Sequence, residues 1–219
     1  FARNKALKEA LKIKFDYLCF VDDDCILDKY WLINNDKFLK NNKADIVTGP
    51  HISKNNIYLN ITERNFPNAK KIKWASTNNV LIDKKILSRK NRFSIRLQQY
   101  GGEDQLFFYK LYKSGYKILW NKYSKVYDYS EKKRINFRWF IDRAKGHGAC
   151  TVMIYTEIFG IFFAYLICLI KFFYDTTLGM ICLVKSFFFK KFMMLKFFYY
   201  FNRAYGNLLS LFFIRKKRY

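Results

Sequence analysis

Residues 17–24 read YLCFVDDD, an apolar run followed at once by three aspartates. An apolar run of this length between polar residues predicts a buried strand of a parallel sheet. Ligands of open α/β sheets bind just beyond the carboxyl ends of such strands. Three adjacent carboxylates repel one another, so a hard divalent cation is their natural partner. The stretch predicts an α/β sheet with a metal and phosphate site; the alternative is an acidic turn that caps the next helix.

The chain up to about residue 148 alternates between helical and strand-like patterns, which is typical of an α/β sheet. Gly115 follows one of the helical patterns, as is common where helices end. We expect helices at residues 2–11, 29–41, 103–114 and 134–145. We expect strands at residues 17–21, 45–50, 74–82 and 116–120.

The sequence changes character after residue 148. Residues 150–170 contain a single charge, Glu157. About 20 apolar residues are needed to cross a bilayer. Residues 176–201 are apolar but interrupted by four lysines, so they fit either a second span or a basic amphipathic helix among lipid headgroups. We expect residues 149–219 to form a membrane-associated helical region; the alternative is that these side chains cover the core of the α/β domain.

The chain of 219 residues is 51% hydrophobic, which excludes a disordered chain, and carries a formal net charge of +24. Such a charge favours nucleic acid or an anionic membrane as a partner. No acidic residue follows Asp175, and the basic residues beyond it adjoin apolar segments without forming a basic-aromatic RNA motif. We therefore expect a membrane partner and no nucleic acid.

The cysteines indicate the redox compartment of the protein, and the amino terminus indicates whether the chain is a fragment. The odd number of cysteines and their spacing argue against a zinc site and against a disulfide framework. We interpret them as small buried hydrophobic residues in a reducing compartment. The chain starts at Phe1 inside a helical pattern and without a signal peptide, so we expect it to be cut there. The five cysteines are Cys19, Cys25, Cys150, Cys168 and Cys182.

A second pair of carboxylates stands at residues 101–104, which read GGED and open the helix predicted at 103–114. Carboxylates at a helix N-terminus are favoured by the exposed amides and the helix dipole, so Glu103 and Asp104 have a structural interpretation as caps. The functional interpretation is that the Gly-Gly loop brings Asp104 to a substrate as a general base.

The helix predicted at residues 134–145 carries a third group of candidate residues. Their spacing of four, one and four places the first three near one helical face. Arginines in this arrangement clamp phosphates, and a tryptophan face suits a sugar or a base. The alternative is contact with lipid headgroups. The residues are Arg134, Arg138, Trp139 and Arg143.

These segments together resemble the ordered landmarks of the family 2 glycosyltransferases with the GT-A fold. The resemblance covers residues 1 to about 148. It rests on ARNKAL at 2–7, FVDDD at 20–24, TNNVLI at 77–82, GGEDQLFF at 101–108 and the Arg138-Trp139 pair. It implies a Rossmann-like mixed α/β sheet that lacks its first strands and is followed by apolar helices. It also implies an inverting transfer of a sugar from a nucleoside-diphosphate donor to a saccharide or lipid-linked acceptor.

The resemblance implies a role for each matching residue. Asp22 and Asp24 match the DxD motif, which binds the donor and a Mg²⁺ or Mn²⁺ ion. Asp104 matches the catalytic base, and Asp128 stands where many relatives have a histidine metal ligand. The expected substrate-binding residues are Asp22, Asp23, Asn79, Glu103, Arg138 and Trp139, and the expected metal ligands are Asp22, Asp24 and Asp128.

Two departures from the family pattern limit these expectations. The chain lacks the strand and nucleotide-binding loop with which relatives begin, so we expect it to bind a nucleotide poorly as it stands. The position of the family's histidine is taken by Asp128, while His147 is expected at a surface or an interface.

The alternatives to this function are another metal-dependent nucleotidyl or phosphoryl transferase and a non-catalytic basic membrane-binding fragment. The expected location is the membrane, with the catalytic domain on the cytoplasmic side and a role in cell-surface polysaccharide or glycolipid synthesis.

Overall fold

The computed structural model describes residues 2–88, 90–98 and 101–212. It divides into two compact units. The first comprises Phe1–Asn55, Glu63–Ser94 and Glu103–Ser130, and the second comprises Asn56–Thr62, Ile95–Gly102 and Glu131–Tyr219. The predicted division near residue 148, with a catalytic domain before it and a membrane region after it, stays a prediction.

The first unit contains a mixed four-stranded sheet in the order β1-β5-β3-β6. Strand β5 pairs antiparallel with both β1 and β3, and β3 pairs parallel with β6. The strands are β1 (Tyr17–Val21), β3 (Ile46–Thr48), β5 (Asn79–Asp83) and β6 (Ile118–Trp120). Each overlaps a segment that the sequence predicts as a strand, so the mixed α/β class is confirmed.

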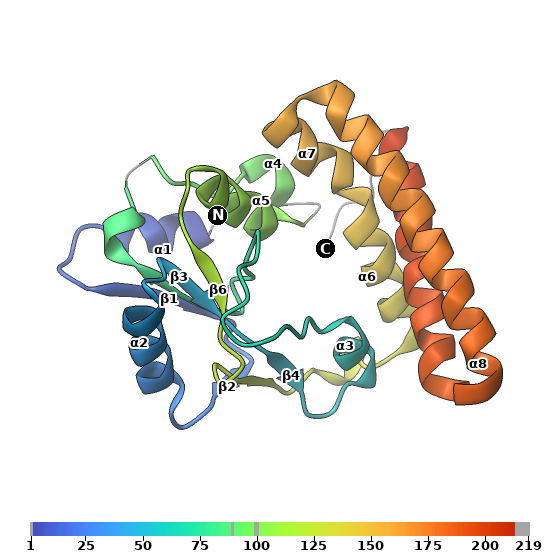
Figure 1. Cartoon of the computed structure of the whole chain (residues 1–219), viewed down its shortest axis with the longest axis horizontal. Coiled ribbons are helices and arrows are strands. Elements are labelled where there is room, and N and C mark those ends of the chain that lie inside the picture. The colour runs from blue at the N-terminus through green and yellow to red at the C-terminus, as the bar shows by residue number, and fades with distance from the viewer. Residues whose placement is uncertain (1, 89, 99–100, 213–219) are drawn as a thin grey trace. The chain divides into compact units, whose positions relative to one another are not determined.

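Helices cover both faces of this sheet because its strands alternate apolar side chains between them. Ile46, Val80 and Ile118 pack toward α1 (Ala2–Ala10) and α5 (Glu103–Lys113). Val47, Leu81 and Leu119 pack toward α2 (Trp31–Asn42). Figure 1 shows α1 and α2 beside the sheet. The result is a three-layer arrangement in which the strand ends are left for a site.

Strand β1 differs from its prediction as a buried strand of a parallel sheet. It lies at the edge of the sheet and has a single strand neighbour, the antiparallel β5, within the described part of the chain. None of its five residues is buried, and Cys19 is exposed. The length and hydrophobicity of the run identify a strand, whereas its place in the sheet depends on pairings that no local pattern encodes.

The cysteine prediction is correct in part. All five side chains are free thiols. Cys150, Cys168 and Cys182 are buried as expected, but Cys19 is exposed and Cys25 is half-buried. The two exceptions flank the acidic turn, where the edge position of β1 leaves less protein to cover them.

A three-stranded sheet in the order β2-β7-β4 extends from the acidic turn, and the sequence does not predict it. Its strands are β2 (Cys25–Leu27), β4 (His51–Ser53) and β7 (Val126–Asp128). Gly49 precedes β4 in a tight passage, where a Cβ atom would stand 2.4 Å from the carbonyl oxygen of Ser124. Glycine is therefore needed for β3 to connect to β4 at this point.

The strand predicted at residues 74–82 forms only from Asn79 onward. Its first half is irregular and makes side-chain hydrogen bonds in place of strand pairing. The carbonyl of Trp74 accepts from Arg64, and the hydroxyl of Ser76 donates to Asp104. Helix α5 ends at Lys113, and Gly115 follows with φ = 93°, in agreement with its predicted role.

The second unit is helical. Its helices are α3 (Ile57–Thr62), α4 (Ile95–Gln98), the short 3-10 helix η2 (Lys132–Arg134), α6 (Phe137–Ala149), α7 (Thr151–Phe159) and α8 (Ile161–Leu211). Helix α6 begins three residues later than predicted, because Asn136 accepts a hydrogen bond from the amide of Trp139 and caps it. Arg134 therefore lies on η2 and does not share a helix with Arg138, Trp139 and Arg143.

Helix α8 doubles back on itself (Figure 1). The Nε atom of Arg203 lies 2.8 Å from Oδ2 of Asp175, although 28 residues of straight helix would span about 42 Å. The Asp175 carboxylate is fully buried and also accepts from Nδ2 of Asn207 at 3.0 Å. The two arms of this helical hairpin are thus joined by a buried polar network.

The returning arm of α8 crosses α6 at a pair of glycines. A Cβ atom on Gly206 would stand 2.1 Å from the carbonyl oxygen of Lys145, and one on Gly148 would stand 2.2 Å from that of Arg203. Small residues permit such close backbone approach. His147, next to this crossing, is half-buried and contacts the hydroxyl of Tyr199 at 3.1 Å, and its expected place at a surface or an interface stays a prediction.

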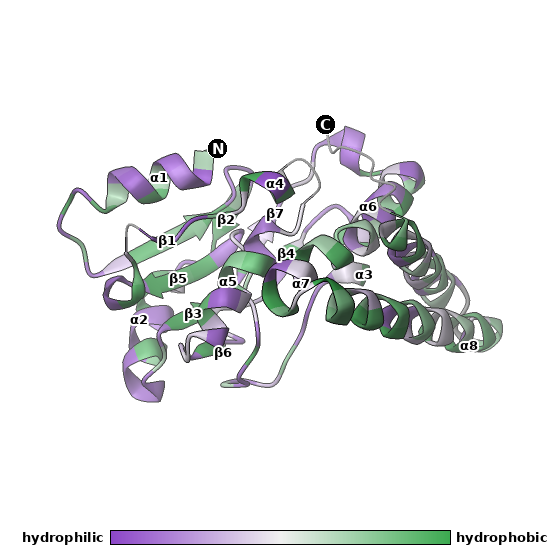
Figure 2. Ribbon diagram, turned by 90° about the horizontal axis from the view of Figure 1, so that it is seen from above, coloured by the Kyte–Doolittle hydropathy of each residue, from purple (hydrophilic) through white to green (hydrophobic). Residues whose placement is uncertain are grey.

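Residues Ile161–Phe188 of α8 are long and apolar enough to cross a bilayer. Figure 2 shows how far hydrophobic residues extend along this helix. Large side chains on it are exposed, among them Phe162, Phe173, Phe187 and Phe188. The basic residues that the sequence places at 215–218 lie outside the described residues.

Candidate functional site

The three aspartates form a tight turn between β1 and β2. The amide of Cys25 donates to the carbonyl of Asp22 at 3.2 Å, which closes the turn. Asp22 and Asp23 are exposed, and Asp24 is half-buried. The aspartates therefore follow the carboxyl end of β1, where the sequence predicts them, but in a strand-to-strand turn and not in a turn that leads into a helix.

The carboxyl group of Asp22 lies close to other charged groups. Crowding by protein atoms raises its pKa, even though the residue as a whole is exposed. Arg3 and His51 oppose this rise, whereas Asp24 and Asp104 add to it. Asp104 is thus near enough to the acidic turn to act on it electrostatically, despite the 80 residues between Asp24 and Asp104.

Asp104 lies in the first turn of α5 and is held by both of its oxygens. Oδ1 accepts from the amide of Gln105 at 2.7 Å, and Oδ2 accepts from the hydroxyl of Ser76 at 3.1 Å. The first contact belongs to the structural role expected at a helix N-terminus. The second reaches Asp104 from the segment before β5, so the carboxylate is oriented from two sides.

Glu103 forms an ion pair with Arg3 of α1. Its other oxygen, Oε2, is buried and has no hydrogen-bond partner within the described part of the chain. Arg3 also acts on Asp22, so this arginine connects the start of α5 with the acidic turn. Sequence reasoning missed Arg3, which only its place in the motif ARNKAL could have indicated.

Asn79 is fully buried at the start of β5. Its oxygen accepts from Trp31 and from the Ser124 hydroxyl, and its nitrogen donates to the carbonyls of Pro50 and Ser124. These four bonds use the full hydrogen-bonding capacity of the amide. The side chain thus joins α2, β5 and the loop before β7, and its predicted role in substrate binding stays a prediction.

Asp128 ends β7 and is buried. Its Oδ1 accepts from the hydroxyls of Ser53 at 3.1 Å and Ser130 at 2.6 Å. Its Oδ2 lies 3.9 Å from Nε2 of His51. The carboxylate is thus fixed by two hydroxyls on one side and faces a histidine on the other.

Cys25, His51 and Asp128 together form a group whose potential ligand atoms all lie within 4.8 Å of one another. The sequence argued against a metal site that includes a cysteine, because no two cysteines have ligand spacing. Such spacing does not reveal Cys25, His51 and Asp128, because they come from three different strands. Cys25 is next to Asp24, whose Oδ1 lies 3.7 Å from its sulfur. Burial and the surrounding carboxylates of Asp22, Asp24 and Asp128 raise the pKa of the Cys25 thiol to about 12.

Glu63 and Arg64 are further charged residues that the sequence did not indicate. Partial burial raises the pKa of the Glu63 carboxyl to about 7, although the backbone amide of His51 opposes this by hydrogen bonding to it. The Arg64 guanidinium lies 3.8 Å from the centroid of the Trp74 ring and donates to the Trp74 carbonyl at 3.1 Å. Burial lowers the pKa of Arg64 to about 10, and Asp104 acts in the opposite direction.

The charges of this region favour a bound cation. The carboxyl groups of Asp22, Asp24, Glu63, Glu103, Asp104 and Asp128 are linked by these contacts, and they outnumber the permanent cations Arg3 and Arg64 by six to two. Hard divalent ions such as Mg²⁺ bind through carboxylate oxygens. Carboxylate oxygens of this kind fit a divalent metal, and the assignment of Asp22, Asp24 and Asp128 as its ligands stays a prediction.

Arg138 and Trp139 lie on α6, in the second unit. Arg138 is exposed, and Trp139 is half-buried against the cluster formed by α3, α6 and α8. The Arg143 guanidinium carbon lies 5.2 Å from the centroid of the Trp139 ring. The structure thus brings Trp139 and Arg143 together, and the contribution of Arg138 and Trp139 to a site with Asp22 and Asp104 stays a prediction.

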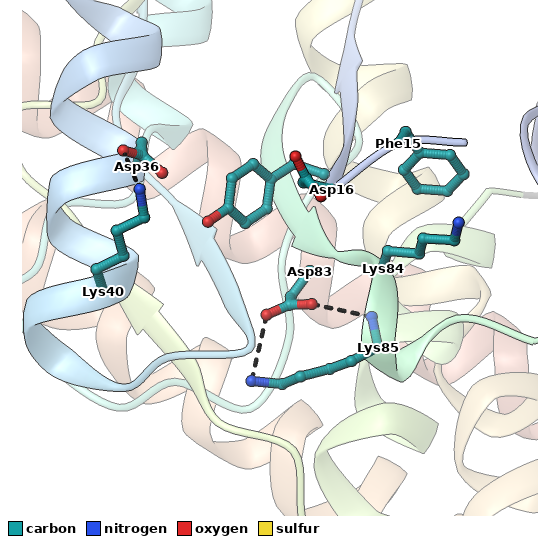
Figure 3. A pocket seen from close by; sticks show the side chains of 8 residues that line it. Phe15, Asp16, Asp36, Lys40, Asp83, Lys84 and Lys85 are labelled. Carbon is teal, nitrogen blue, oxygen red and sulfur yellow. Dashed lines mark hydrogen bonds and ion pairs between the residues drawn. The ribbon is translucent and has the colours of Figure 1, made fainter. Parts of the chain in front are cut away.

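A cavity of about 700 Å³ lies at the opposite, amino end of β1 (Figure 3). None of the predicted site residues lines it. Four of its charged side chains form ion pairs with one another, Lys40 with Asp36 at 2.9 Å and Lys85 with Asp83 at 3.2 Å. With its charges compensated in this way, the cavity is not the site that the sequence predicts.

No protein-family model and no curated protein matches the sequence. Solved structures are similar to part of the chain, among them the following two. The crystal structure of A197 from STIV has a TM-score of 0.44 and 19% sequence identity, covering 59% of this chain and 66% of that chain. The crystal structure of S. aureus TarS has a TM-score of 0.45 and 19% identity, covering 65% of this chain and 25% of that chain. The chain thus spans just under two thirds of A197 and a quarter of TarS, and its function is inferred from the site residues.

Proposed function

We propose that the chain is a metal-dependent glycosyltransferase of the family 2 type, with a GT-A-like fold, that transfers a sugar from a nucleoside-diphosphate donor to an acceptor hydroxyl with inversion. One observation carries the proposal: the same unit contains the acidic turn that follows β1 and, on α5, the Asp104 carboxylate, which Ser76 and the Gln105 amide orient from two sides. A metal-binding acidic turn and a separate, oriented carboxylate are the two parts that this reaction needs.

The acidic turn serves the donor. Asp22, Asp24 and Asp128 are the proposed ligands of Mg²⁺ or Mn²⁺, and Asp22 and Asp23 also contact the donor. When bound, the metal neutralises charge on the diphosphate leaving group. Arg64 supplies a further positive charge next to Asp104, and Arg138 and Trp139 are the proposed contacts to diphosphate and acceptor.

Asp104 serves the acceptor as general base. It takes the proton of the acceptor hydroxyl while that oxygen attacks the anomeric carbon from the face opposite the diphosphate. The bond from the anomeric carbon to the diphosphate oxygen breaks, and its electron pair leaves with the diphosphate. Ser76 and the Gln105 amide orient the carboxylate for this step, and Glu103 orients the acceptor.

The helical unit supports a location at the membrane. The segment Ile161–Phe188 has the length and composition of a bilayer span and exposes large apolar side chains, while Lys185, Lys191 and Lys196 supply positive charge for anionic headgroups. We place the catalytic unit on the cytoplasmic side, with a saccharide or lipid-linked acceptor, in the synthesis of a cell-surface polysaccharide or glycolipid.

The test compares Asp104→Asn with Asp36→Asn, a control carboxylate of α2 that lines the cavity at the other end of β1. Purified protein is incubated with a panel of nucleotide sugars and Mn²⁺ or Mg²⁺, and release of nucleoside diphosphate is measured. We expect metal-dependent release that falls by about 10²–10⁴-fold in Asp104→Asn with donor binding unchanged. Turnover that survives Asp104→Asn, or that persists after chelation of the metal, would refute the assignment.

A further inference from the structure

Three chemically different metal-binding side chains meet on the three-stranded sheet. Cys25 of β2 is directly opposite Asp128 of β7. His51 of β4 is opposite Val126, which is two residues before Asp128 on the same strand. Residues two apart on a strand, and residues opposite one another on neighbouring strands, share a face of the sheet. The register alone therefore brings a thiol, an imidazole and a carboxylate to one face.

The separations of the three groups match a tetrahedral metal site. The sulfur of Cys25 lies 3.5 Å from Nε2 of His51, and this nitrogen lies 3.9 Å from Oδ2 of Asp128. Zinc bonds of about 2.3 Å to sulfur and about 2.0–2.2 Å to nitrogen and oxygen place tetrahedral ligands about 3.4–3.6 Å apart. All three ligand atoms lie within 4.8 Å of one another, so movements of up to about an ångström would bring them to bonding distance.

The same distances argue against a catalytic cysteine. In a nucleophile relay the histidine uses one ring nitrogen for the thiol and the other for the carboxylate. Here both Cys25 and Asp128 approach the same nitrogen, Nε2 of His51. An arrangement in which sulfur, nitrogen and oxygen converge is that of ligands around one ion.

Neighbouring hydroxyls hold the carboxylate for such an ion. Ser53 and Ser130 both donate to Oδ1 of Asp128, so Oδ2 is the oxygen left toward His51. Outer hydrogen bonds of this kind orient metal ligands and contribute to metal affinity.

We propose that Cys25, His51 and Asp128 bind zinc, or another divalent ion with affinity for sulfur. Asp24, whose Oδ1 is 3.7 Å from the sulfur, or a water molecule completes the coordination. Mixed sulfur, nitrogen and oxygen ligands suit zinc or cobalt, whereas Mg²⁺ prefers oxygen ligands in an octahedron. This inference does not rest on the proposed transferase activity. Since Asp128 belongs to both ligand sets, a zinc ion here would compete with Mg²⁺ or Mn²⁺ for that carboxylate.

The test uses Co²⁺ as a spectroscopic substitute for zinc. The purified chain is freed of metal with a chelator and titrated with Co²⁺, and the thiolate-to-cobalt charge-transfer absorbance is recorded. Zinc is then added to displace the cobalt. We expect one equivalent of bound metal, a thiolate band that zinc abolishes, and no displacement by a large excess of Mg²⁺.

Matched variants assign the ligands. Cys25→Ser should lose the thiolate band, whereas Cys19→Ser, an exposed cysteine on the adjoining strand, should keep it. Ser130→Ala should keep the band but weaken zinc binding by about 10–100-fold, since it removes a hydroxyl from Asp128. His51→Gln, with folding checked by circular dichroism, is an independent variant should Cys25→Ser fail to fold. A band that survives Cys25→Ser, zinc affinity unchanged in folded His51→Gln, or displacement by equimolar Mg²⁺ would each overturn the proposal.

Discussion

Buried and half-buried charges occur in both units, but they are compensated differently. In the helical hairpin, Asp175 receives two bonds from Arg203 and one from Asn207, so the carboxylate is satisfied within the protein. At the carboxyl end of β1, the carboxyl group of Asp22 lies near those of Asp24 and Asp104, and the basic groups near it are Arg3 and His51. Charges that are paired within the protein have a structural role, whereas an excess of negative charge favours binding of a cation.

The largest expected effect comes from breaking the compensated network. Asp175→Leu leaves the Arg203 guanidinium without its carboxylate inside the helical hairpin. Removing one partner of a buried ion pair costs about 3–5 kcal/mol. Thermal unfolding of the purified protein, in the detergent or lipid used to isolate it, measures the loss.

The double variant Asp175→Leu with Arg203→Leu is the control for that experiment. Because it replaces both charges with apolar groups, it should recover most of the stability lost by the single variant. If the loss of stability in the double variant equals the sum of the losses in the two single variants, Asp175 and Arg203 do not act as a pair.

The next largest effect concerns the crossing of α6 and α8. Gly206→Ala places a methyl group 2.1 Å from the carbonyl oxygen of Lys145, and we expect a loss of about 1–3 kcal/mol. Gly179→Ala is a matched control on the same helix, because its methyl group would meet its nearest neighbour at an ordinary 3.7 Å. There alanine should be neutral or stabilise by up to about 1 kcal/mol, since it favours the helix. Equal destabilisation by both variants in thermal unfolding would rule out a close helix crossing as the cause.

The two units also differ in how much of them the sequence predicts. The strand at residues 17–21, the acidic turn and the helix from Glu103 follow from apolar runs and helix-end signals, which are local. The apolar run from Ile161 likewise predicts a helix. The return of α8 is not local, because it depends on a pair of residues, Asp175 and Arg203, that are 28 positions apart.

The candidate metal ligands show the same limit. Strands β2, β4 and β7 have three residues each, too few to show a period of two. Cys25, His51 and Asp128 are 26 and 77 residues apart and meet only through the register of those strands. A search for paired cysteines therefore could not find them. The motif that contains Asn79 is local, but the burial of Asn79 depends on Trp31 and Ser124, which are distant in sequence.

A smaller effect is expected for Arg64, which belongs to the site region. Arg64→Lys keeps the charge near Asp104 but loses the planar stack on Trp74, because lysine has no planar group. We expect a loss of stability of about 0.5–2 kcal/mol, the range of cation–π contacts. Arg64→Gln should cost as much or more, since it also removes the charge. Trp74→Leu combined with Arg64→Lys tests the contact directly, because the two losses should not add if stacking is their common cause.

The smallest effect should come from a substitution in the cavity at the amino end of β1. It tests whether the two ends of that strand behave differently. Lys85 is mostly exposed and lies 3.1 Å from Asp45 and 3.2 Å from Asp83. Exposed ion pairs contribute about 0–1 kcal/mol, because water and salt screen them and the side chains lose freedom. Lys85→Ala should therefore change the unfolding temperature little and leave metal binding unchanged, whereas Cys25→Ser at the other end should change metal binding most. Equal effects of the two variants on metal binding would show that the ion responds to the overall charge of the unit and not to ligands at the end of β1.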